Sequence, residues 1–483
     1  MVYGRREWSK PKDIPDDPQH ARVPSNAYGD SFGEGRGMER LGGEDVGQRA
    51  PVRQVVLASL IGTTIEWYDF FVYGTAAALV FNQLFFPNVS PTIGTLAAFA
   101  TFGVGFLARP LGGIVFGHYG DRVGRKSMLV ITLLIMGIAT TLIGLLPSYG
   151  TIGIWAPILL VALRFLQGLA VGGEWGGAVL MAVEYSPEDR RGFYGSWPQM
   201  GSPIALFLST VIFSAFAALP DKQFLSWGWR VPFLVSIVLV GVGLFIRLRI
   251  FETPAFSQVK ESGTAARLPI IDVLRNDLAK VLLAAGIVFV TIGGFYVVVT
   301  FSLSYGTETL GISRGVMLTG VIVAAISELI TIPIFASLSD RVGRRPVCIW
   351  SAAVATVLAF PFFWILGTKV AILIWLAFAV YAAVLGGVYG PGAAFVAEQF
   401  ETRVRYSGAS LGYQLSGVLS GAFAPLIATA LLAASGGAIW PVALYLAGLS
   451  LVSLISAYLA TETYRADIYE GVRPQANQAV AES

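Results

Sequence analysis

The sequence has very little of the chemistry on which enzymes and metalloproteins depend. Its 483 residues include one cysteine, Cys348, and two histidines, His20 and His118. A single cysteine excludes an intrachain disulfide framework, and so few cysteines and histidines leave no zinc cluster. The sequence also shows no nucleophile–base set and no phosphate-binding loop, so we expect no catalytic residue, no metal and no cofactor.

Charged residues are scarce as well. They make up 13% of the chain, whereas an average soluble domain has about 25%. Hydrophobic residues make up 55% of the chain and fall in blocks of about 20, the length that spans a bilayer as a helix. The sequence therefore predicts an all-α integral membrane protein whose surroundings are the lipid bilayer, with no nucleic-acid partner.

Twelve apolar spans follow one another between two polar tails. They cover residues 54–80, 91–117, 127–147, 152–183, 193–218, 232–250, 281–304, 315–337, 347–367, 370–396, 407–434 and 439–460. We predict a disordered tail over 1–50, a six-helix half over 51–250, a central loop over 251–280, a second six-helix half over 281–460 and a tail over 461–483.

One charged heptapeptide occurs twice. GDRVGRK at 120–126 and SDRVGRR at 339–345 share five of seven residues and lie 219 positions apart. An acid and an arginine that follow the fourth span, Glu184 and Arg191, match Glu398 and Arg405, each 214 positions later. Because both repeats keep the same helix order, they predict two equivalent halves related by an axis along the membrane normal.

Lysine and arginine are distributed unevenly between the two sides of the predicted spans. Of the 33, 27 lie on the side of the tails and of the repeated heptapeptide, and four lie on the other side. The remaining two, Arg109 and Arg164, fall inside spans. By the positive-inside rule, both termini are expected in the cytoplasm.

Charges inside a membrane span are costly unless they are paired or hydrated. The first span carries Glu66 and Asp69 on one helix face, with Tyr73 one turn after Asp69. Two neighbouring ionised acids would repel each other, which makes this pair a candidate proton-binding site. The alternative is that one acid forms a structural salt bridge with a neighbouring helix.

The fourth span contains RFLQGLAVGGEWGG at 164–177, with two charges, Arg164 and Glu174. Arg164 cannot easily lose its charge, so we expect it to face the interior and meet a carboxylate of the first span or of a solute. Glycines recur every four residues in this stretch and predict close helix packing. Arg109, near the end of the second span, either snorkels to the surface or pairs with an acid.

Only one charge of the second half lies well inside a span, Glu328, and both a functional and a structural role are open for it. Neutral candidates for lining a polar cavity are Gln199 in the fifth span and Tyr413 and Gln414 in the eleventh; core packing is the alternative for each. Because the buried charges concentrate in the first half, proton coupling is expected mainly there.

These stretches resemble a known family. GHYGDRVGRK (117–126) resembles the signature between helices 2 and 3 of the major facilitator superfamily, and RFLQG (164–168) resembles the motif of its fourth helix. IEWYDFFVYG (65–74) and SWGWRVPFL (226–234) are similar to its metabolite:proton symporter family, which includes shikimate, α-ketoglutarate, citrate and proline/betaine transporters. The resemblance covers residues from about Arg53 to Leu459.

The resemblance implies twelve helices in two pseudo-symmetric halves that rock around a central site. It implies that Arg164 takes part in proton transfer and that Asp121 holds a cytoplasmic gate against a helix N-terminus of the other half. The implied gate residues are Gly117, Asp121, Arg122, Gly124, Arg125 and Lys126 in the first copy and, in a weaker role, Asp340, Arg341, Gly343, Arg344 and Arg345 in the second.

We therefore expect a monomeric proton-coupled symporter that imports a small polar metabolite, either an organic acid such as shikimate or a dicarboxylate, or a betaine- or proline-like zwitterion. Residue 66 is glutamate where shikimate transporters of the family carry aspartate, and SWPQMGSP (196–203) departs from the family pattern. The substrate therefore stays open. The alternatives are a transporter-like nutrient sensor without net flux and a proton-coupled exporter; a channel fits the paired gate motifs less well.

Overall fold

The computed structural model describes residues 52–123, 125–172, 174–184, 186–249, 269–401 and 404–464. Within these ranges the regular elements are helices, and the all-α prediction is confirmed. The predicted tail over 1–50, most of the predicted central loop and the tail from residue 465 lie outside the described residues.

The N-terminal helices, called here the N-terminal set, occupy residues 52–249. They are α1 (Val52–Leu79), α2 (Phe81–Phe85), α3 (Pro91–Val123), α4 (Arg125–Leu145), α5 (Tyr149–Ile152), α6 (Trp155–Val171), α7 (Glu174–Glu184), η1 (Glu188–Arg190), α8 (Arg191–Ala217), α9 (Asp221–Ser226), η2 (Gly228–Arg230) and α10 (Val231–Arg249).

The C-terminal set occupies residues 269–464. It contains α12 (Pro269–Asn276), α13 (Leu278–Ile287), η3 (Val290–Gly294), η4 (Val297–Phe301), α14 (Ser302–Ser304), η5 (Tyr305–Thr309), α15 (Arg314–Val342), α16 (Arg344–Gly367), α17 (Ala371–Glu398), α18 (Arg405–Ser416), η6 (Gly417–Gly421), α19 (Ala424–Ala434) and α20 (Trp440–Leu459).

Nine helical stretches in the described ranges are long and apolar enough to cross a membrane. With α1, α4 and α6 they account for the twelve predicted spans. Three spans are not continuous α-helices. The fourth consists of α6 and α7, the eleventh of α18, η6 and α19, and the seventh contains the π-helical segments η3, η4 and η5. Such π segments are frequent at functional sites.

The two copies of the heptapeptide lie at helix ends, although their polar composition is typical of a loop between two spans. Helix α3 runs to Val123 and α4 begins at Arg125; likewise α15 runs to Val342 and α16 begins at Arg344. In the second copy the single residue between the helices, Gly343, has φ +106°, a backbone conformation that favours glycine. Because the chain turns within this one residue, its charged neighbours stand on helix ends.

Part of the predicted central loop is also helical. Residues Pro269–Asn276 form α12, which packs against α13 and α18. Within it Val273 is buried while its neighbour Leu274 is exposed. The polar composition of the whole 251–280 segment concealed this short helix.

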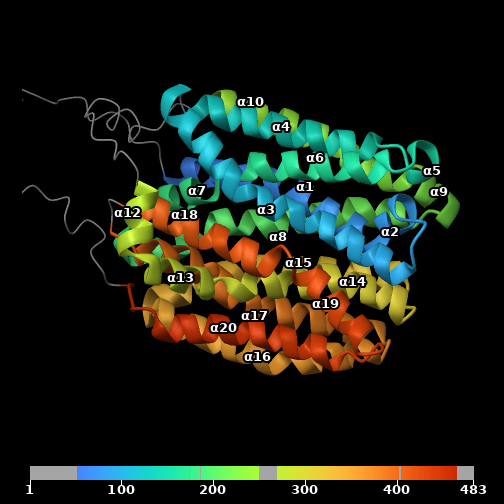
Figure 1. Cartoon of the computed structure of the whole chain (residues 1–483). Coiled ribbons are helices and arrows are strands. Elements are labelled where there is room, and N and C mark those ends of the chain that lie inside the picture. The colour runs from blue at the N-terminus through green and yellow to red at the C-terminus, as the bar shows by residue number, and fades with distance from the viewer. Residues whose placement is uncertain are drawn as a thin grey trace, which may run out of the picture. The chain divides into compact units, whose positions relative to one another are not determined.

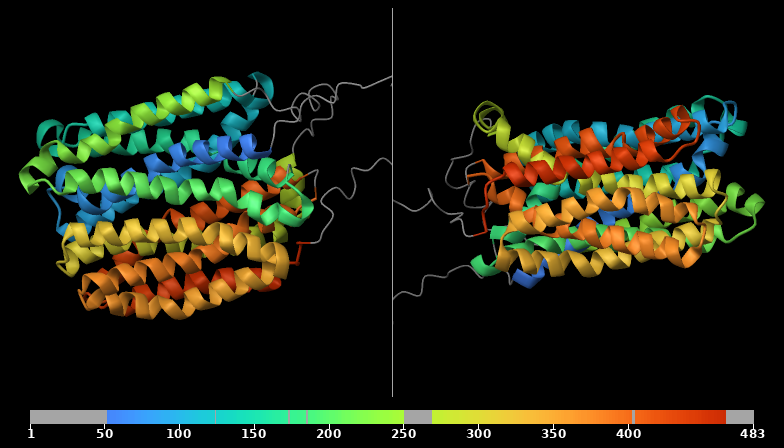
Figure 2. Two further views of the ribbon diagram at one scale, coloured as in Figure 1. Left: turned by 180° about the vertical axis from the view of Figure 1, so that it is seen from behind. Right: turned by 90° about the horizontal axis from the view of Figure 1, so that it is seen from below.

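The two sets of helices pack against each other along their length. Within the N-terminal set α1 packs on α8, α3 on α6 and α4 on α10; within the C-terminal set α15 packs on α17, and α16 on α17 and α20. Between the sets, α15 packs on α8 and α19 on α3. Figure 1 shows the blue-to-green helices beside the yellow-to-red ones, and the views of Figure 2 show the same long helices running alongside one another.

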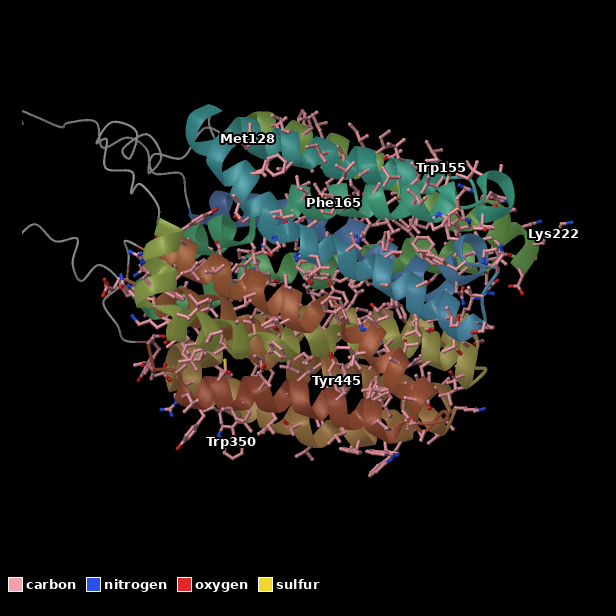
Figure 3. The ribbon with its side chains drawn as sticks, viewed as in Figure 1. Met128, Trp155, Phe165, Lys222, Trp350 and Tyr445 are labelled. Carbon is pink, nitrogen blue, oxygen red and sulfur yellow. The ribbon has the colours of Figure 1, made fainter. Side chains whose placement is uncertain are left out.

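Large apolar side chains cover the outside of these helices. Trp155, Trp350 and Trp364 are all exposed, and Figure 3 shows Trp155 and Trp350 pointing away from the bundle. Water would penalise such a surface, whereas the hydrocarbon region of a bilayer accommodates it. The outer surface therefore agrees with a protein that crosses a membrane many times.

The two ends of the bundle differ in their residues. The motif end carries the first turn of α8, the last turn of α15 and the first turn of α16, which includes the second heptapeptide. The opposite end carries α2, α9 and η5, and Lys222 of α9 lies there in Figure 3.

Candidate functional site

A small cavity of about 10 Å³ lies between the two sets of helices. The N-terminal set contributes Trp67, Phe71 and Ser202, and the C-terminal set contributes Thr291, Ile292, Phe295, Tyr296, Glu328, Tyr389 and Tyr413. Apolar and aromatic walls with a few polar groups are typical of small-molecule sites, whose usual volume is about 300–1,000 Å³. In this conformation the cavity has room for about one water molecule, so a solute would bind only after the lining residues move apart.

Two of the predicted site residues, Glu328 and Tyr413, line this cavity. Glu328 is 3% exposed, and the ion pairs found among the described residues do not include it. The hydroxyl of Tyr296 is buried and has no hydrogen-bond partner within the described part of the chain, whereas the hydroxyls of Tyr389 and Tyr413 interact with each other. The cavity therefore presents one carboxylate and three tyrosine hydroxyls to a polar solute.

Next to the cavity, two buried arginines lie against one phenylalanine ring. The Cζ atoms of Arg109 and Arg164 are 4.1 Å and 4.0 Å from the ring centroid of Phe70. Arg164 also lies over Tyr73, with 4.2 Å between Cζ and the ring centroid, and Arg109 lies over Phe106 at 4.4 Å. A desolvated cation over an aromatic face gains about 2 kcal/mol, so these rings stabilise the two charges.

The hydrogen bonds of these arginines are incomplete. Nη1 of Arg164 donates to Oε1 of Gln167 at 3.1 Å, and Nε2 of Gln167 donates to the hydroxyl of Thr140 at 2.6 Å. The Nε and Nη2 atoms of both Arg164 and Arg109 have no acceptor among the described residues. Among the described residues Arg164 has no direct ion pair, but Asp69 of the first span acts on it electrostatically. The two guanidinium groups retain donors for an anionic group.

The two acids of the first span have different neighbours. Asp69 is 1% exposed and faces Thr140 and Arg164, and its Oδ2 has no hydrogen-bond partner in the described ranges. Glu66 is also buried and acts electrostatically on Tyr413. Asp69 thus belongs to the arginine cluster, whereas Glu66 lies nearer the contact between α1 and the C-terminal set.

The hydroxyl of Tyr73, predicted one turn after Asp69, donates to Oγ1 of Thr101 at 2.6 Å. The glycines of the fourth span pack as predicted. A side chain at Gly168 would collide with the backbone of Gly105 on α3, and a side chain at Gly172 would collide with the carbonyl of Arg109. This close approach of α3 and α6 brings Arg109 and Arg164 to the same ring.

Gln199 and Gln414 contribute to contacts around the break in the fourth span. Oε1 of Gln199 accepts a hydrogen bond from Nε1 of Trp175 at 2.9 Å, and Nε2 of Gln414 donates to the carbonyl of Gly172 at 3.0 Å. The side chains of Glu174 and of the first heptapeptide, including Asp121, lie outside what the structure describes.

The second heptapeptide connects the two sets at the motif end. Oδ1 and Oδ2 of Asp340 accept the N–H groups of Gly192 and Phe193, both at 2.8 Å, in the first turn of α8. Nη1 of Arg344 pairs with Oδ1 of Asp340 at 2.6 Å, and its Nη2 with Oε1 of Glu398 at 3.3 Å. A carboxylate at a helix N-terminus satisfies two free donors and meets the positive end of the helix dipole.

The other residues of this heptapeptide have different surroundings. Arg341 is exposed, and the backbone N–H groups of Arg344 and Arg345 donate to the carboxylate of Glu462 after α20, each at 3.0 Å. The Arg345 guanidinium lies over the ring of Tyr458 and donates to its carbonyl. These contacts stay within the C-terminal set, so Asp340 is the member of the second copy that reaches across.

A second cross-set ion pair lies at the motif end. Nη1 of Arg405, at the start of α18, is 3.7 Å from Oε1 of Glu184 at the end of α7. Partial burial raises the pKa of the Glu184 carboxyl, and the Arg405 charge opposes this. The acid of the first copy of this repeat, Glu184, therefore pairs with the arginine of the second copy, Arg405, whereas Glu398 pairs with Arg344.

The opposite end is closed by polar contacts that the sequence did not predict. The carboxylate of Glu308 in η5 accepts from Nδ2 of Asn82 at 2.7 Å and from the hydroxyl of Thr95 at 3.1 Å. Nη2 of Arg314 pairs with Oδ1 of Asp221 at 2.9 Å. Both contacts join the two sets, so the central cavity has cross-set contacts at both ends.

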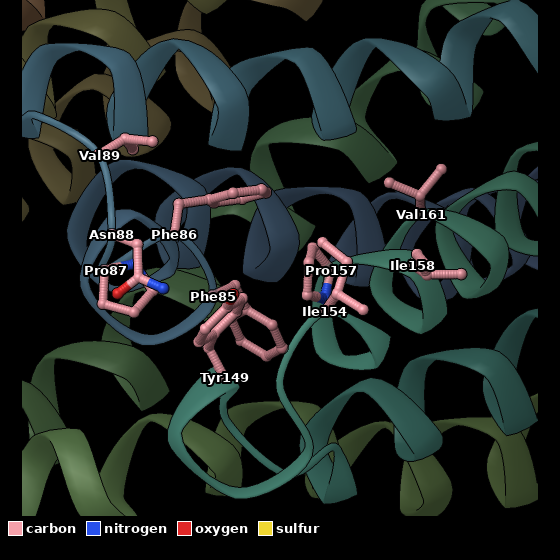
Figure 4. A pocket seen from close by; sticks show the side chains of 10 residues that line it. All are labelled: Phe85, Phe86, Pro87, Asn88, Val89, Tyr149, Ile154, Pro157, Ile158 and Val161. Atoms are coloured by element: carbon pink, nitrogen blue, oxygen red, sulfur yellow. The ribbon is translucent and has the colours of Figure 1, made fainter.

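A larger apolar pocket of about 480 Å³ lies within the N-terminal set, at the end of α2 and beside α6. Figure 4 shows its lining residues, which include Phe85, Phe86, Tyr149 and Pro157. Its lining contains neither a carboxylate nor a guanidinium group. The central cavity is therefore the better candidate site for a polar solute.

Sequence reasoning missed most of the cavity wall and the contacts of Glu308. Two signals were present: Gly293-Gly294 followed by Phe295-Tyr296 in an otherwise aliphatic span, and Glu308 as the only acid between Asp277 and Glu328. Both fall in the seventh span, where the helix has π character.

Comparison with known proteins agrees with this architecture. Residues 59–421 match the family model described as Major Facilitator Superfamily. The chain belongs to this family. Its members are membrane transporters, so the expectation that the protein is not an enzyme is confirmed.

Individual relatives cover nearly the whole chain. The shikimate transporter of Escherichia coli (strain K12) is 46% identical over 423 residues, which are 86% of this chain and 95% of that protein. The proline/betaine transporter of the same organism is 36% identical over 436 residues, 88% of this chain and 86% of that protein. The family resemblance seen in the sequence is confirmed.

Solved structures show the same fold. A crystal structure of a D-xylose–proton symporter has a TM-score of 0.68 and 18% sequence identity, and the match covers 86% of this chain and all of that one. An inward-open xylose transporter from E. coli has a TM-score of 0.66 and 18% identity, covering 87% of this chain and 99% of that one. The major facilitator fold predicted from the sequence is confirmed.

Proposed function

We propose that the protein is a monomeric, proton-coupled symporter that imports a small carboxylate-bearing metabolite. The observation that carries this proposal is the pair of buried guanidinium groups, Arg109 and Arg164, which keep free donors beside a closed central cavity. An unpaired buried charge is strongly unfavourable, and an anionic solute would compensate it. Arginine matches the planar geometry of a carboxylate.

The contacts at the two ends support alternating access. The motif end faces the cytoplasm in this proposal, as the distribution of lysine and arginine predicts. In the conformation described here, contacts join the two sets at both ends, so it corresponds to an occluded state. The N-terminal and C-terminal sets would move as two halves, and breaking the contacts of Asp340 and Arg405 would open the site to the cytoplasm.

Asp69 is the proposed proton site. It is buried beside Arg164, on the wall of the same cluster that would hold the solute carboxylate. A protonated Asp69 leaves Arg164 free for the solute, whereas an ionised Asp69 competes for the same guanidinium group. Binding of a proton and of an anionic solute would therefore favour each other.

Shikimate is the first solute to test, because the shikimate transporter of E. coli is 46% identical to this chain. The lining residues Tyr296, Glu328, Tyr389 and Tyr413 would bind the hydroxyl groups of such a solute, while the arginine cluster binds its carboxylate. A dicarboxylate or a betaine- or proline-like zwitterion also carries a carboxylate, and these are the other members of the panel.

The test is uptake of radiolabelled shikimate, α-ketoglutarate, proline and betaine by proteoliposomes that contain the purified protein. We expect uptake of at least one solute to increase when the interior is alkaline and to fall to the empty-liposome level with a protonophore. Binding without flux for the whole panel would instead identify a sensor, and flux that ignores the pH gradient would refute proton coupling. Efflux against a solute gradient driven by protons would support the exporter alternative.

A further inference from the structure

Two aromatic rings from the two sets of helices stack directly below the central cavity. Trp175 of α7 and Tyr413 of α18 have ring centroids 3.8 Å apart and planes inclined by 8°. Both side chains are buried. The Trp175 ring is held in place because its Nε1 donates to Oε1 of Gln199 on α8, at 2.9 Å.

A hydrogen bond strengthens this contact. Gln414, the residue after Tyr413, donates from Nε2 to the carbonyl of Gly172 at 3.0 Å. Gly172 follows α6, where the fourth span is interrupted before α7. A helix end leaves carbonyl groups without partners in the helix itself, so the interruption supplies the acceptor that α18 uses.

The stack lies between the cavity and the contacts of the motif end. Trp175 is nine residues before Glu184 on the same helix, which corresponds to a rise of about 14 Å. Glu184 is the partner of Arg405 at the motif end, while Tyr413 lines the cavity itself. The stack is therefore an inner closure, distinct from the outer ion pairs.

The hydroxyl of Tyr413 is a second observation that connects the stack to the site. It is buried, it belongs to a cavity-lining residue, and its neighbour is the hydroxyl of Tyr389, which lines the same cavity. Each hydroxyl can donate one hydrogen bond and accept others. A polar solute in the cavity would therefore form hydrogen bonds with this tyrosine pair.

We propose that Tyr413 couples solute binding to the inner closure of the transport path: its hydroxyl contacts the solute, and its ring closes the motif end against Trp175. The proposal rests on the proposed transport function. Because one rigid side chain carries both contacts, a solute that changes the position of the hydroxyl also changes the stacked ring. The inner closure then responds to whether the site is occupied.

The test uses a cysteine reporter in the cavity. Cys348, the one native cysteine, is buried and is replaced by alanine, and Ser202 in the cavity wall is replaced by cysteine. In inside-out vesicles, the labelling rate with a membrane-impermeant maleimide measures access from the cytoplasmic side. Trp175→Ala removes the stack and should raise this rate about tenfold, whereas Trp175→Phe retains a stacking ring and should raise it less.

Gln414→Leu is the second variant and should also accelerate labelling, because it removes the hydrogen bond to Gly172. It keeps the test decisive if Trp175→Ala does not fold, which its elution in gel filtration would show. Tyr381→Phe is the matched control: it also removes a buried tyrosine hydroxyl of the C-terminal set, but Tyr381 does not line the cavity and donates to the carbonyl of Ala355 at 3.2 Å. It should label at the rate of the reporter protein alone.

The solute contact is tested by adding shikimate, α-ketoglutarate, proline or betaine to the same vesicles. In the reporter protein at least one solute should change the labelling rate several-fold. Tyr413→Phe retains the ring and should lose this response, while Tyr381→Phe should keep it. Unchanged labelling in the folded Trp175→Ala or Gln414→Leu variants would overturn the inner closure, and a full solute response in Tyr413→Phe would overturn the coupling. Failure of the proposed transport function would appear separately, as absence of flux in proteoliposomes.

Discussion

Replacing Asp340 with asparagine should weaken closure of the motif end. The Asp340 carboxylate accepts two backbone N–H groups of α8 at 2.8 Å and pairs with Arg344. Asparagine keeps one acceptor oxygen but loses the charge and the second acceptor. A hydrogen bond to a charged group contributes about 1.5–3 kcal/mol, so the closed conformation should lose roughly 2 kcal/mol relative to the open one, a shift of about 30-fold in the equilibrium.

The measurement is again the labelling rate of Ser202→Cys in a Cys348→Ala background, from the cytoplasmic side. The rate should rise by about the factor of 30 given above, provided that opening and closing are fast compared with labelling, so that the rate follows the population of the open conformation. Asp221→Asn is the comparison at the opposite end, where it removes the cross-set ion pair with Arg314. Asp221 is exposed, so this pair contributes at most about 1 kcal/mol, and its loss should not raise labelling from the cytoplasmic side. An unchanged rate in Asp340→Asn would mean that Asp340 keeps the same amide partners in both conformations, and the gate assignment would be refuted.

Three further predictions concern the arginine cluster and the helix packing. Arg164→Lys removes the planar group that lies against Phe70, so uptake should fall at least about tenfold; an unchanged rate and apparent affinity would contradict the role of Arg164. Asp69→Asn should abolish uptake driven by a pH gradient while sparing solute exchange, and a pH dependence like that of the unmodified protein would place the proton site elsewhere. Gly168→Val has no room against Gly105 and should lower the free energy of unfolding by about 1–3 kcal/mol, measured by thermal unfolding in detergent against Gly241→Ala, whose added methyl group meets open space.

Contacts between the two sets surround the small central cavity. Asp340 and Glu308 join the sets at the two ends, and the stack of Trp175 and Tyr413 joins them next to the cavity, so in the proposed transport cycle this conformation is the occluded one. Opening either end requires breaking charge-assisted hydrogen bonds of about 1.5–3 kcal/mol each. A transported solute would recover part of this free energy through the unpaired donors of Arg109 and Arg164.

Several features of the site could be predicted from the sequence because they depend on the free energy of placing a single residue in the membrane. A charged side chain inside an apolar span is costly and therefore indicates a functional or paired residue. Asp69, Arg164 and Glu328 were identified in this way. All three are buried, and Glu328 lines the cavity. Helical spacing also predicted the glycine packing of the fourth span, since small residues every four positions form one face.

Other features could not be predicted because they depend on partners far apart in the chain. Asn82 and Thr95 are ordinary polar residues until the fold places them at Glu308, 226 and 213 positions away. The aromatic cavity wall was hidden because aromatic residues are common throughout a membrane span, and their number in the sequence does not say which face the interior. Whether Arg164 forms an ion pair with a carboxylate of the first span likewise depends on tertiary geometry. In the structure Asp69 acts on Arg164 electrostatically without a direct ion pair.

The repeated heptapeptide shows most clearly which properties follow from the sequence and which depend on the tertiary structure. The sequence by itself determined that the chain is a helical membrane protein with two similar halves, because hydrophobic length, charge distribution and an internal repeat are local or periodic properties. Only the tertiary structure decided that the repeat forms helix ends rather than a loop, and that Asp340 meets the first turn of α8, 148 residues away in sequence. The physical reason is that hydrophobicity selects where a segment lies, whereas the partner of a buried charge depends on which helices pack against each other.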